Sequence, residues 1–408
     1  MRGAGKRILM LVENLPVPFD RRVWQEANAL RDAGYAVSVI CPTGPGCDAR
    51  FELIDGIAVY RYRLAVEAAG AAGYAIEYAT ALLATCALAW RVFFTRGFDA
   101  IHACNPPDLF FLIGGFFKLF GKRFVFDHHD LCPELFEAKF GRRGLPYRAL
   151  LRLERWTFRT ADVSIATNES YRRIAIERGG MRPERVFVVR SGPSLERLKR
   201  LPPDARYRCG RRHLVGYVGV MGRQEGIEYL LRAVRHIVFE LGRRDIHFGL
   251  VGGGTSLAEL KALAAQLDIA GYVTFTGRVA DHELLALLNT ADVCVNPDAA
   301  NELNDKSTMN KVMEYMALGK PIVQFDLTEG RYSAQAASLY ARRNDPIDLA
   351  VKIVALIDDP ERRARMGEHG RRRVADELEW RHEVPKLLAA YQALWPTTET
   401  RRHEAAAS

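Results

Sequence analysis

Short apolar runs alternate with longer amphipathic stretches from the start of the chain. Residues 6–13 (KRILMLVE) and 35–42 (YAVSVICP) have the length and composition of buried strands. Between them, Val23, Ala27 and Leu30 are spaced to share one face of a helix. This strand–helix–strand order predicts a parallel sheet with helices on its faces.

The same alternation continues in two blocks separated by a polar segment. Residues 191–213 carry three prolines and no hydrophobic period, which is typical of a linker. We therefore predict an α/β fold of two Rossmann-like, doubly wound parallel-sheet domains facing a cleft, at residues 1–191 and 192–376. Residues 377–396 predict a helix that crosses back to the first domain, and residues 397–408 a disordered tail. Further strands are expected at residues 98–103, 122–129, 161–168, 184–190, 213–220, 246–254, 272–279, 291–297 and 320–326.

Composition narrows the possible partners. The chain has 408 residues, 49% of them hydrophobic and 26% charged, as in ordinary globular proteins, and its net charge of +9 favours an anionic partner. No zinc-finger or RNP-like signature accompanies this charge, which argues against a nucleic-acid partner. The seven cysteines are scattered and never in a CxxC spacing, which predicts reduced thiols and a cytoplasmic location.

Two apolar stretches raise the question of a membrane. Residues 78–90 (YATALLATCALAW) and 110–120 (FFLIGGFFKLF) are both shorter than the ~20 residues of a membrane-spanning helix. They fit core helices of an α/β domain, or segments that dip into a bilayer interface at the inner face of the cell membrane. The second possibility draws on basic residues that flank both stretches, namely Arg91, Arg96, Lys118, Lys122 and Arg123.

The loop and helix at residues 295–323 are the richest in candidate chemistry. Ligands bind beyond the carboxyl ends of parallel strands, where helix N-termini favour phosphate. We expect Ser307 or Thr308 to cap the helix here. Glu314 lies one turn after Asn310 and could bind ribose hydroxyls, while Lys306 could neutralise a phosphate. A capped surface helix with solvated charges would show the same spacing.

Four segments in order carry a resemblance to a known family. Residues 213–234 have the pattern of a strand, a glycine loop and a helix, and residues 249–279 that of a strand, a glycine turn, a helix and a strand. Residues 284–297 lead into the loop at residues 295–323, and residues 311–323 have the sequence KVMEYMALGKPIV. Together they resemble the family 4 retaining glycosyltransferases of GT-B fold, including polysaccharide and O-antigen-type sugar transferases. The resemblance implies a nucleotide-sugar donor in the second domain and an acceptor in the first.

The resemblance also implies roles for single residues, and the sequence departs from the family at several of them. Glu314 matches the second glutamate of the family's paired motif, but the first is replaced by Lys306. The phosphate-binding Arg and Lys of relatives are replaced by Val220 and Glu225, and Arg223 lies between these two positions. We predict Lys306 and Arg223 as catalytic groups that stabilise the leaving diphosphate. The predicted donor-binding residues are Gly222, Arg223, Gly252, Gly277, Arg278, Lys306, Met309, Asn310, Lys311 and Glu314.

Histidines and charged residues after strands of the first domain are the acceptor-side candidates. His102 matches one family histidine, and Cys104 replaces a second. In the segment FDHHDLCPE we predict His128 and His129 as catalytic, although a ring hydrogen-bonded for structural reasons fits the pattern equally well. The predicted acceptor-binding residues are Asp20, Arg21, Arg22, Asn105, Asp130 and Glu134.

These observations predict a metal-independent glycosyltransferase without a cofactor. It would transfer a sugar from a UDP-sugar to a lipid-pyrophosphate-linked sugar or a glycan, in cell-surface polysaccharide synthesis, with possible peripheral contact to the membrane. The replaced motif residues leave two alternatives open. One is a catalytically silent GT-B protein that binds a nucleotide-sugar, and the other is a sugar-nucleotide epimerase.

Overall fold

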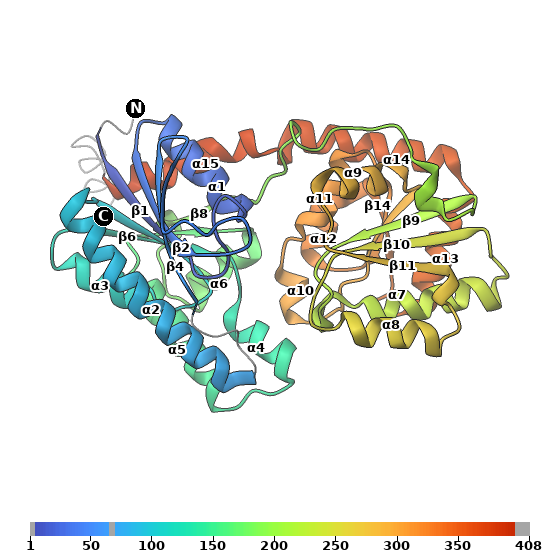
Figure 1. The fold of residues 1–408 in the computed structure, drawn as a ribbon, viewed down its shortest axis with the longest axis horizontal. Helices are drawn as coiled ribbons and strands as arrows, with labels where there is room; N and C mark the ends of the chain where they lie inside the picture. Colours follow the sequence, from blue (N-terminus) through green and yellow to red (C-terminus); the bar gives the residue numbers. More distant parts are fainter. Residues whose placement is uncertain (1–4, 65–69, 396–408) are drawn as a thin grey trace. The chain divides into compact units, whose positions relative to one another are not determined.

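The computed structural model describes residues 5–64 and 70–395, which fold into two compact α/β units (Figure 1). The first unit contains the described residues up to Glu137, Gly141–Ser191 and those from Glu383 onward. The second consists chiefly of Gly192–His382. The predicted tail at residues 397–408 lies outside the described residues.

The first unit is built on an eight-stranded sheet with the order β3-β4-β2-β1-β5-β6-β7-β8. All neighbouring pairs are parallel except β3 and β4, which pair antiparallel. The central strand is almost entirely buried, which explains its continuous apolar sequence. The strands are β1 (Arg7–Leu11), β2 (Ala36–Pro42), β3 (Phe51–Ile54), β4 (Ile57–Tyr62), β5 (Ala100–Cys104), β6 (Arg123–His128), β7 (Val163–Ala166) and β8 (Val186–Val188).

Helices cover both faces of this sheet, with α2, α3 and α5 on one face and α1 on the other (Figure 1). The last helix, α15, starts three residues later than predicted because residues Val374–Leu378 form a separate π-helical turn and Glu379 is extended. The helices are α1 (Arg21–Asp32), α2 (Gly70–Thr95), α3 (Phe111–Lys118), α4 (Cys132–Phe140), α5 (Leu145–Thr160), α6 (Glu169–Glu177) and α15 (Trp380–Leu394).

The β3–β4 hairpin was not predicted from the sequence. Its turn is Asp55-Gly56, and both residues have positive φ angles, of 48° and 82°. An Asp-Gly pair between two short strands is a known hairpin signal, because both central residues of such a turn need this conformation. The hairpin adds the one antiparallel pair at the edge of the sheet.

The second unit has a six-stranded, fully parallel sheet with the order β11-β10-β9-β12-β13-β14. Five of these strands were predicted. The edge strand β14 was not, because its four residues have no apolar run. The strands are β9 (His213–Val218), β10 (Ile246–Val251), β11 (Val273–Gly277), β12 (Val293–Asn296), β13 (Ile322–Phe325) and β14 (Ser338–Ala341).

The helices of the second unit differ from the prediction around the loop richest in candidate chemistry. Neither Ser307 nor Thr308 is the N-cap of a helix: an additional short helix is capped by Asn301, and the next begins at Asn310 without a side-chain cap. The helices are α7 (Ile227–Arg235), α8 (Leu257–Gln266), α9 (Asp281–Thr290), α10 (Glu302–Lys306), α11 (Asn310–Ala317), α12 (Thr328–Ala334), α13 (Pro346–Ile357) and α14 (Pro360–Arg373).

Two adjacent glycines of α3 allow a matched test of its packing on the sheet. A Cβ atom on Gly114 would lie 2.2 Å from the Phe124 ring of β6, whereas one on Gly115 would lie 3.6 Å from Thr160. We expect Gly114→Ala to lower the free energy of unfolding by about 1–3 kcal/mol through overpacking. Gly115→Ala should leave it unchanged or raise it by up to about 1 kcal/mol, because alanine favours the helix. Urea unfolding measures both, and equal midpoints for the two variants would contradict this packing.

Candidate functional site

The loops after β9, β10 and β11 pack tightly against one another at the carboxyl edge of the second sheet. The backbone N–H of Gly252 donates to the carbonyl of Gly277 at 2.9 Å, and that of Met221 donates to Gly253 at 3.0 Å. Gly252 has a φ of 138°, and a Cβ there would lie 1.8 Å from the carbonyl oxygen of Gly219. Only glycine fits at this position, and backbone without side chains is what close approach to a phosphate requires.

A buried ion-pair cluster lies beside these loops. The Nζ atom of Lys311, in α11, lies 2.5 Å from Oε2 of Glu225 and 2.8 Å from Oδ1 of Asp298. The hydroxyl of Tyr217 donates to the same oxygen of Glu225 at 3.1 Å. The side chain of Lys311 is 11% exposed and that of Asp298 is 1% exposed. The cluster therefore ties together the loop after β9, the loop after β12 and the first turn of α11.

The charges of Lys311, Glu225 and Asp298 sum to zero when Asp298 is protonated and to −1 when it is ionised. Burial opposes the charge of Lys311, but Asp298 and Glu225 outweigh it and hold the pKa of the amine well above its ordinary value. Burial raises the pKa of Asp298 to about 7, against the opposing effect of Lys311. Lys311 was predicted to bind the donor, but both carboxylates already neutralise its charge in this structure.

The other predicted cations of this edge are less buried than Lys311. Arg223 is 77% exposed and its guanidinium lies 3.8 Å from Glu259. Lys306 ends α10, and its amine lies 3.6 Å from Glu302, one turn earlier. Arg278 follows β11 and is exposed. An exposed pair such as that of Arg223 and Glu259 contributes little energy, so Arg223 can exchange its partner for a bound anion. Lys306 is half-buried at 34% exposure.

Glu314, the predicted ribose-binding carboxylate, forms an ion pair with Arg197. Arg197 also lies 3.4 Å from Asp281. Met309 and Asn310 start the helix that carries Glu314, as the predicted donor set requires. The structure thus brings all ten predicted donor-binding residues to the carboxyl edge of one sheet, but it adds Arg197, which was not predicted, as the partner of Glu314.

The acceptor-side residues of the first unit surround a buried carboxylate, Asp127, at the end of β6. Arg22 pairs with Asp127 at 2.8 Å and with Glu26 at 3.0 Å. His129 hydrogen-bonds to Asp127, and His102 lies 3.3 Å from it. Arg22 was predicted to bind the acceptor, but it is buried and held by these groups. In this structure Arg22 is a buried ion-pair partner, and its contact with an acceptor stays a prediction.

Opposite pKa shifts distinguish the two carboxylates of this cluster. Burial opposes ionisation of Asp127, but the charges of Arg22 and His129 outweigh it and hold its pKa well below the ordinary range. Burial raises the pKa of Glu26 well above its ordinary value. Asp127 is therefore the charged partner that orients His129, whose ring is 16% exposed.

Two other predicted residues are buried away from solvent. His128 is fully buried among Phe126, Phe158 and Tyr171, and burial lowers its pKa to about 3. It is therefore neutral, and in this structure only His129 of the pair has an exposed ring surface. Glu134 is also buried and forms a two-point ion pair with Arg178 at 2.6 and 3.2 Å. It is a structural residue rather than an acceptor contact.

Asn105 and Asp20 organise the loops in which they lie. The side-chain oxygen of Asn105 accepts hydrogen bonds from the backbone N–H groups of His129 and Asp130, at 2.6 and 3.1 Å. Asn105 is itself buried, so it positions the His129 loop. Asp20 caps α1 by accepting from Val23 at 3.1 Å, and Arg21 follows it on the exposed side of the helix.

Two overlapping groups in the described part of the first unit have ligand atoms within 4.8 Å of one another. One consists of His102, Cys104 and Asp127, and the other of Glu26, Asp127 and His129. The guanidinium of Arg22 contacts both carboxylates and supplies the positive charge that a metal ion would otherwise bring. The geometry therefore favours an ion-pair network at this position.

Several residues of both sites were not identified from the sequence: Glu26, Asp127, Arg197 and Asp298. Asp127 stands within the segment FDHHD, so the end of the strand was a usable signal. Asp298 and Arg197 carried no local signal, because their partners are distant along the chain.

Comparisons with known proteins agree with this architecture. Residues 20–192 match a model described as glycosyl transferase 4-like domain, and residues 212–359 match one described as glycosyl transferases group 1. Over its full length the chain is similar to sucrose-phosphate synthase from Thermosynechococcus elongatus, with a TM-score of 0.74 and 19% identity over 99% of this chain and 100% of that one. It is also similar to HepE from Anabaena in complex with UDP and glucose, with a TM-score of 0.75 and 18% identity over 95% of this chain and 100% of that one.

Curated relatives match over shorter stretches. A 2-deoxystreptamine glucosyltransferase of Streptomyces kanamyceticus is 26% identical over 59% of this chain, which spans 62% of that relative. An alpha-maltose-1-phosphate synthase of Mycolicibacterium smegmatis is 26% identical over 67% of this chain and 74% of its own length. The two family models cover both units, and the architecture is that of the solved neighbours. The chain belongs to the family 4 glycosyltransferases, enzymes of GT-B fold.

Proposed function

We propose that this protein is a retaining glycosyltransferase that uses a UDP-sugar and a lipid-pyrophosphate-linked or glycan acceptor. It would act in cell-surface polysaccharide synthesis at the cytoplasmic face of the membrane. The observation that carries the proposal is the carboxyl edge of the second sheet, where glycine-lined loops, Glu314 and exposed cations lie together. UDP is favoured as the nucleotide because the solved neighbour HepE binds UDP and UDP-glucose.

The exposed cations are better suited than Lys311 to stabilise the leaving group. When the bond between the sugar and the diphosphate breaks, negative charge develops on the departing phosphate oxygen. Lys311 is already neutralised by Glu225 and Asp298, whereas Arg223 is 77% exposed and Lys306 is half-buried, with its amine 3.6 Å from Glu302. We assign the charge-stabilising role to these two side chains. The acceptor hydroxyl then attacks the anomeric carbon of the sugar on the same face from which the diphosphate departs. The proton of this hydroxyl passes to an oxygen of the departing phosphate.

The first unit would supply the acceptor contacts through His129 and Asp130. His129 is held by Asp127, and both loop residues are positioned by Asn105. A fixed imidazole at the end of a strand can hydrogen-bond a sugar hydroxyl without losing side-chain entropy on binding. We keep His129, and not the buried His128, as the histidine that contacts substrate.

One observation favours a second candidate, a catalytically silent nucleotide-sugar-binding protein. Glu225 stands where relatives carry a cation, and it removes the charge of Lys311 from the site. Release of nucleotide from the donor separates the possibilities. Release that depends on acceptor supports transfer, binding without release supports the silent protein, and conversion of the donor alone supports an epimerase.

Substitution of Lys306 tests the leaving-group role. We expect Lys306→Ala to lower kcat by about 100-fold, the usual effect of removing one group that stabilises developing charge, with a smaller change in donor KM. Lys352→Ala is a matched control, since Lys352 also pairs with a carboxylate one turn earlier, Asp348, but lies in α13. Steady-state kinetics that show no fall in kcat for the Lys306 variant would remove this residue from catalysis.

Lys311 should instead affect stability. We expect Lys311→Met to lower the free energy of unfolding by about 3–5 kcal/mol, because Asp298 is left buried without a positive partner. Adding Asp298→Asn should restore much of the loss, since the more deeply buried of the two carboxylates then has no charge, and only Glu225, 17% exposed, remains without Lys311. Urea unfolding of the two variants measures this recovery. A Lys311 variant as stable as the native protein would show that the buried pair is not structural.

Glu314 is expected to bind the ribose of the donor. Hydrogen bonds to a charged group contribute about 1.5–3 kcal/mol, so Glu314→Ala should weaken UDP binding by roughly 10- to 100-fold. Glu361→Ala, on the exposed side of α14, is the control and should leave the affinity unchanged. Isothermal calorimetry gives both values, and an unaltered UDP affinity in the Glu314 variant places the ribose elsewhere.

A further inference from the structure

One face of α2 is apolar and exposed. Residues Ile76–Thr95 of this helix have a mean hydropathy of 1.3, yet only 22% of this segment is buried. Ile76, Leu83, Ala87 and Phe94 recur at helical spacing on the exposed face, with Leu83 at 71% and Phe94 at 76% exposure. A helix in the protein core would bury this apolar face. The prediction that residues 78–90 form a core helix therefore holds only for the opposite face of α2, which packs on the sheet.

The side of α2 that is buried faces the sheet. Ala81, Thr85, Ala89 and Val92 repeat every three to four residues and are almost fully buried. The helix packs on β2 and β4 through this side. Because Thr85 and its neighbours are committed to the protein core, α2 lies along the surface of the folded unit and does not cross a bilayer as an isolated span.

The exposed face continues onto α3 and the residues that follow it. The Trp90 ring of α2 lies 5.5 Å from the Phe116 ring and 5.9 Å from the Phe120 ring, measured between centroids. Leu119, at the end of α3, is 80% exposed. Exposed apolar areas of this extent in soluble proteins usually mark an interaction surface. We call it the apolar patch; its members are Ile76, Leu83, Phe94, Leu112, Phe116, Leu119 and Phe120.

Positive charge borders the apolar patch. Arg91 lies over the Tyr60 ring, Arg96 over Phe51 and Lys122 over Phe93, at 5.9, 5.8 and 5.5 Å. In the described part of the chain these three cations contact aromatic rings rather than carboxylates, so their charge is available to an anionic partner.

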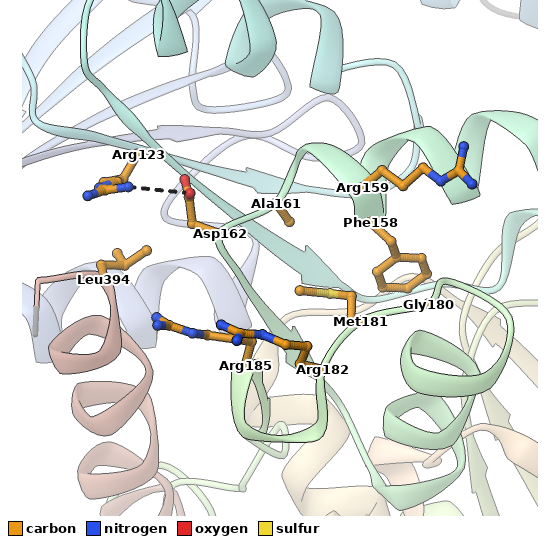
Figure 2. A pocket seen from close by; sticks show the side chains of 10 residues that line it. All are labelled: Arg123, Phe158, Arg159, Ala161, Asp162, Gly180, Met181, Arg182, Arg185 and Leu394. Carbon is orange, nitrogen blue, oxygen red and sulfur yellow. Dashed lines mark ion pairs between the residues drawn. The ribbon is translucent and has the colours of Figure 1, made fainter. Parts of the chain in front are cut away.

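A pocket lined by arginines begins where the apolar patch ends. It has a volume of about 460 Å³ at the amino edge of β6 and β7, and Figure 2 shows Arg182 and Arg185 reaching toward the side that carries Arg123. Asp162 is the one carboxylate among its described lining residues. It pairs with Arg123 at 3.6 Å and with Lys118, of α3, at 3.1 Å, which joins the pocket to the patch.

We propose that the first unit docks on an anionic lipid bilayer through the apolar patch, with the bordering cations and the arginine pocket on the lipid phosphates. Apolar side chains with cations around them match the two layers of a bilayer surface, acyl chains beneath charged headgroups. A second protein copy would have to present a complementary negative rim, whereas this chain carries a net charge of +9. The docking surface does not depend on the donor site in the second unit.

Docking would also bring the membrane close to the acceptor-side loops. Burial, and then the charge of Glu77 in α2, raise the pKa of Glu13 to about 7, so the start of this helix lies near the loop after β1. That loop ends at Asp20, the cap of α1, and Arg21 is the first residue of this helix. A lipid-linked acceptor would therefore meet the first unit without leaving the bilayer, a consequence that rests on the proposed function.

Vesicle sedimentation of the full-length protein tests the proposal. We expect binding to equimolar phosphatidylcholine–phosphatidylglycerol vesicles and none to phosphatidylcholine alone. Leu83→Glu combined with Leu119→Glu should abolish binding, because both exposed side chains would carry charge into the acyl region. Ile347→Glu changes an apolar side chain of the second unit that is 52% exposed, and this variant should bind as the native protein does. An unchanged urea-unfolding midpoint in both variants shows that they are folded. Because this control does not involve UDP, failure of vesicle binding is distinguishable from failure of the proposed function.

The arginine pocket has a test of its own. Each cation near an anionic surface contributes roughly fivefold in affinity, so Arg159→Ala with Arg182→Ala should weaken vesicle binding by roughly 25-fold. Vesicle binding that the patch substitutions leave unaffected would overturn the proposal. So would resistance of the native protein to alkaline carbonate extraction, which is typical of a spanning helix. A native dimer that binds no vesicles and becomes monomeric on substitution of the patch would overturn it as well.

Discussion

The buried amine of Lys311 is the contact on which the candidate donor site depends. It joins the loops after β9 and β12 to the first turn of α11, three segments that meet only at the carboxyl edge of the second sheet. An unpaired charge at this depth would cost several kcal/mol, so the three segments must keep their positions for the chain to stay folded. Glu314 follows one turn later on the same helix, which fixes its position relative to the glycine loops.

The same principle organises the first unit. Asp127 is buried at the end of β6, and its charge is held by Arg22 from α1 and by His129. Asn105, from the loop after β5, then holds the backbone of His129 and Asp130. In both units a buried carboxylate and a buried cation connect loops that parallel strands bring to one edge, and the exposed residues around them remain able to bind ligands.

The donor edge has one deeply buried cation, Lys311, and two less buried ones, Arg223 and Lys306, and this difference helps to explain the departures from the family's sequence pattern. The resemblance implies that Lys306 replaces a glutamate and Glu225 a cation, and the sequence predicted that Arg223 and Lys306 supply the positive charge instead. In the structure Glu225 pairs with Lys311, while Arg223 is exposed and Lys306 is half-buried. The positive charge is thus moved to the rim of the edge rather than lost.

Local patterns predicted most of the fold and less of the sites. The central strands could be predicted because strands buried on both faces need consecutive apolar residues. The strand β14 and the helix α10 lack such runs. The Asp55-Gly56 hairpin had a signal that was not used. The charge pairs could not be predicted: Glu225 and Lys311 are 86 positions apart, and nothing near either residue indicates its partner. The exposure of one face of α2 likewise depends on what covers it, which sequence periodicity does not reveal.

Calorimetric titration of the full-length protein tests whether the second unit binds a nucleotide. UDP, GDP, ADP and dTDP would each be titrated with and without a divalent cation. The account predicts selective binding of UDP that does not need the cation. Absence of binding by all four nucleotides under both conditions would contradict it.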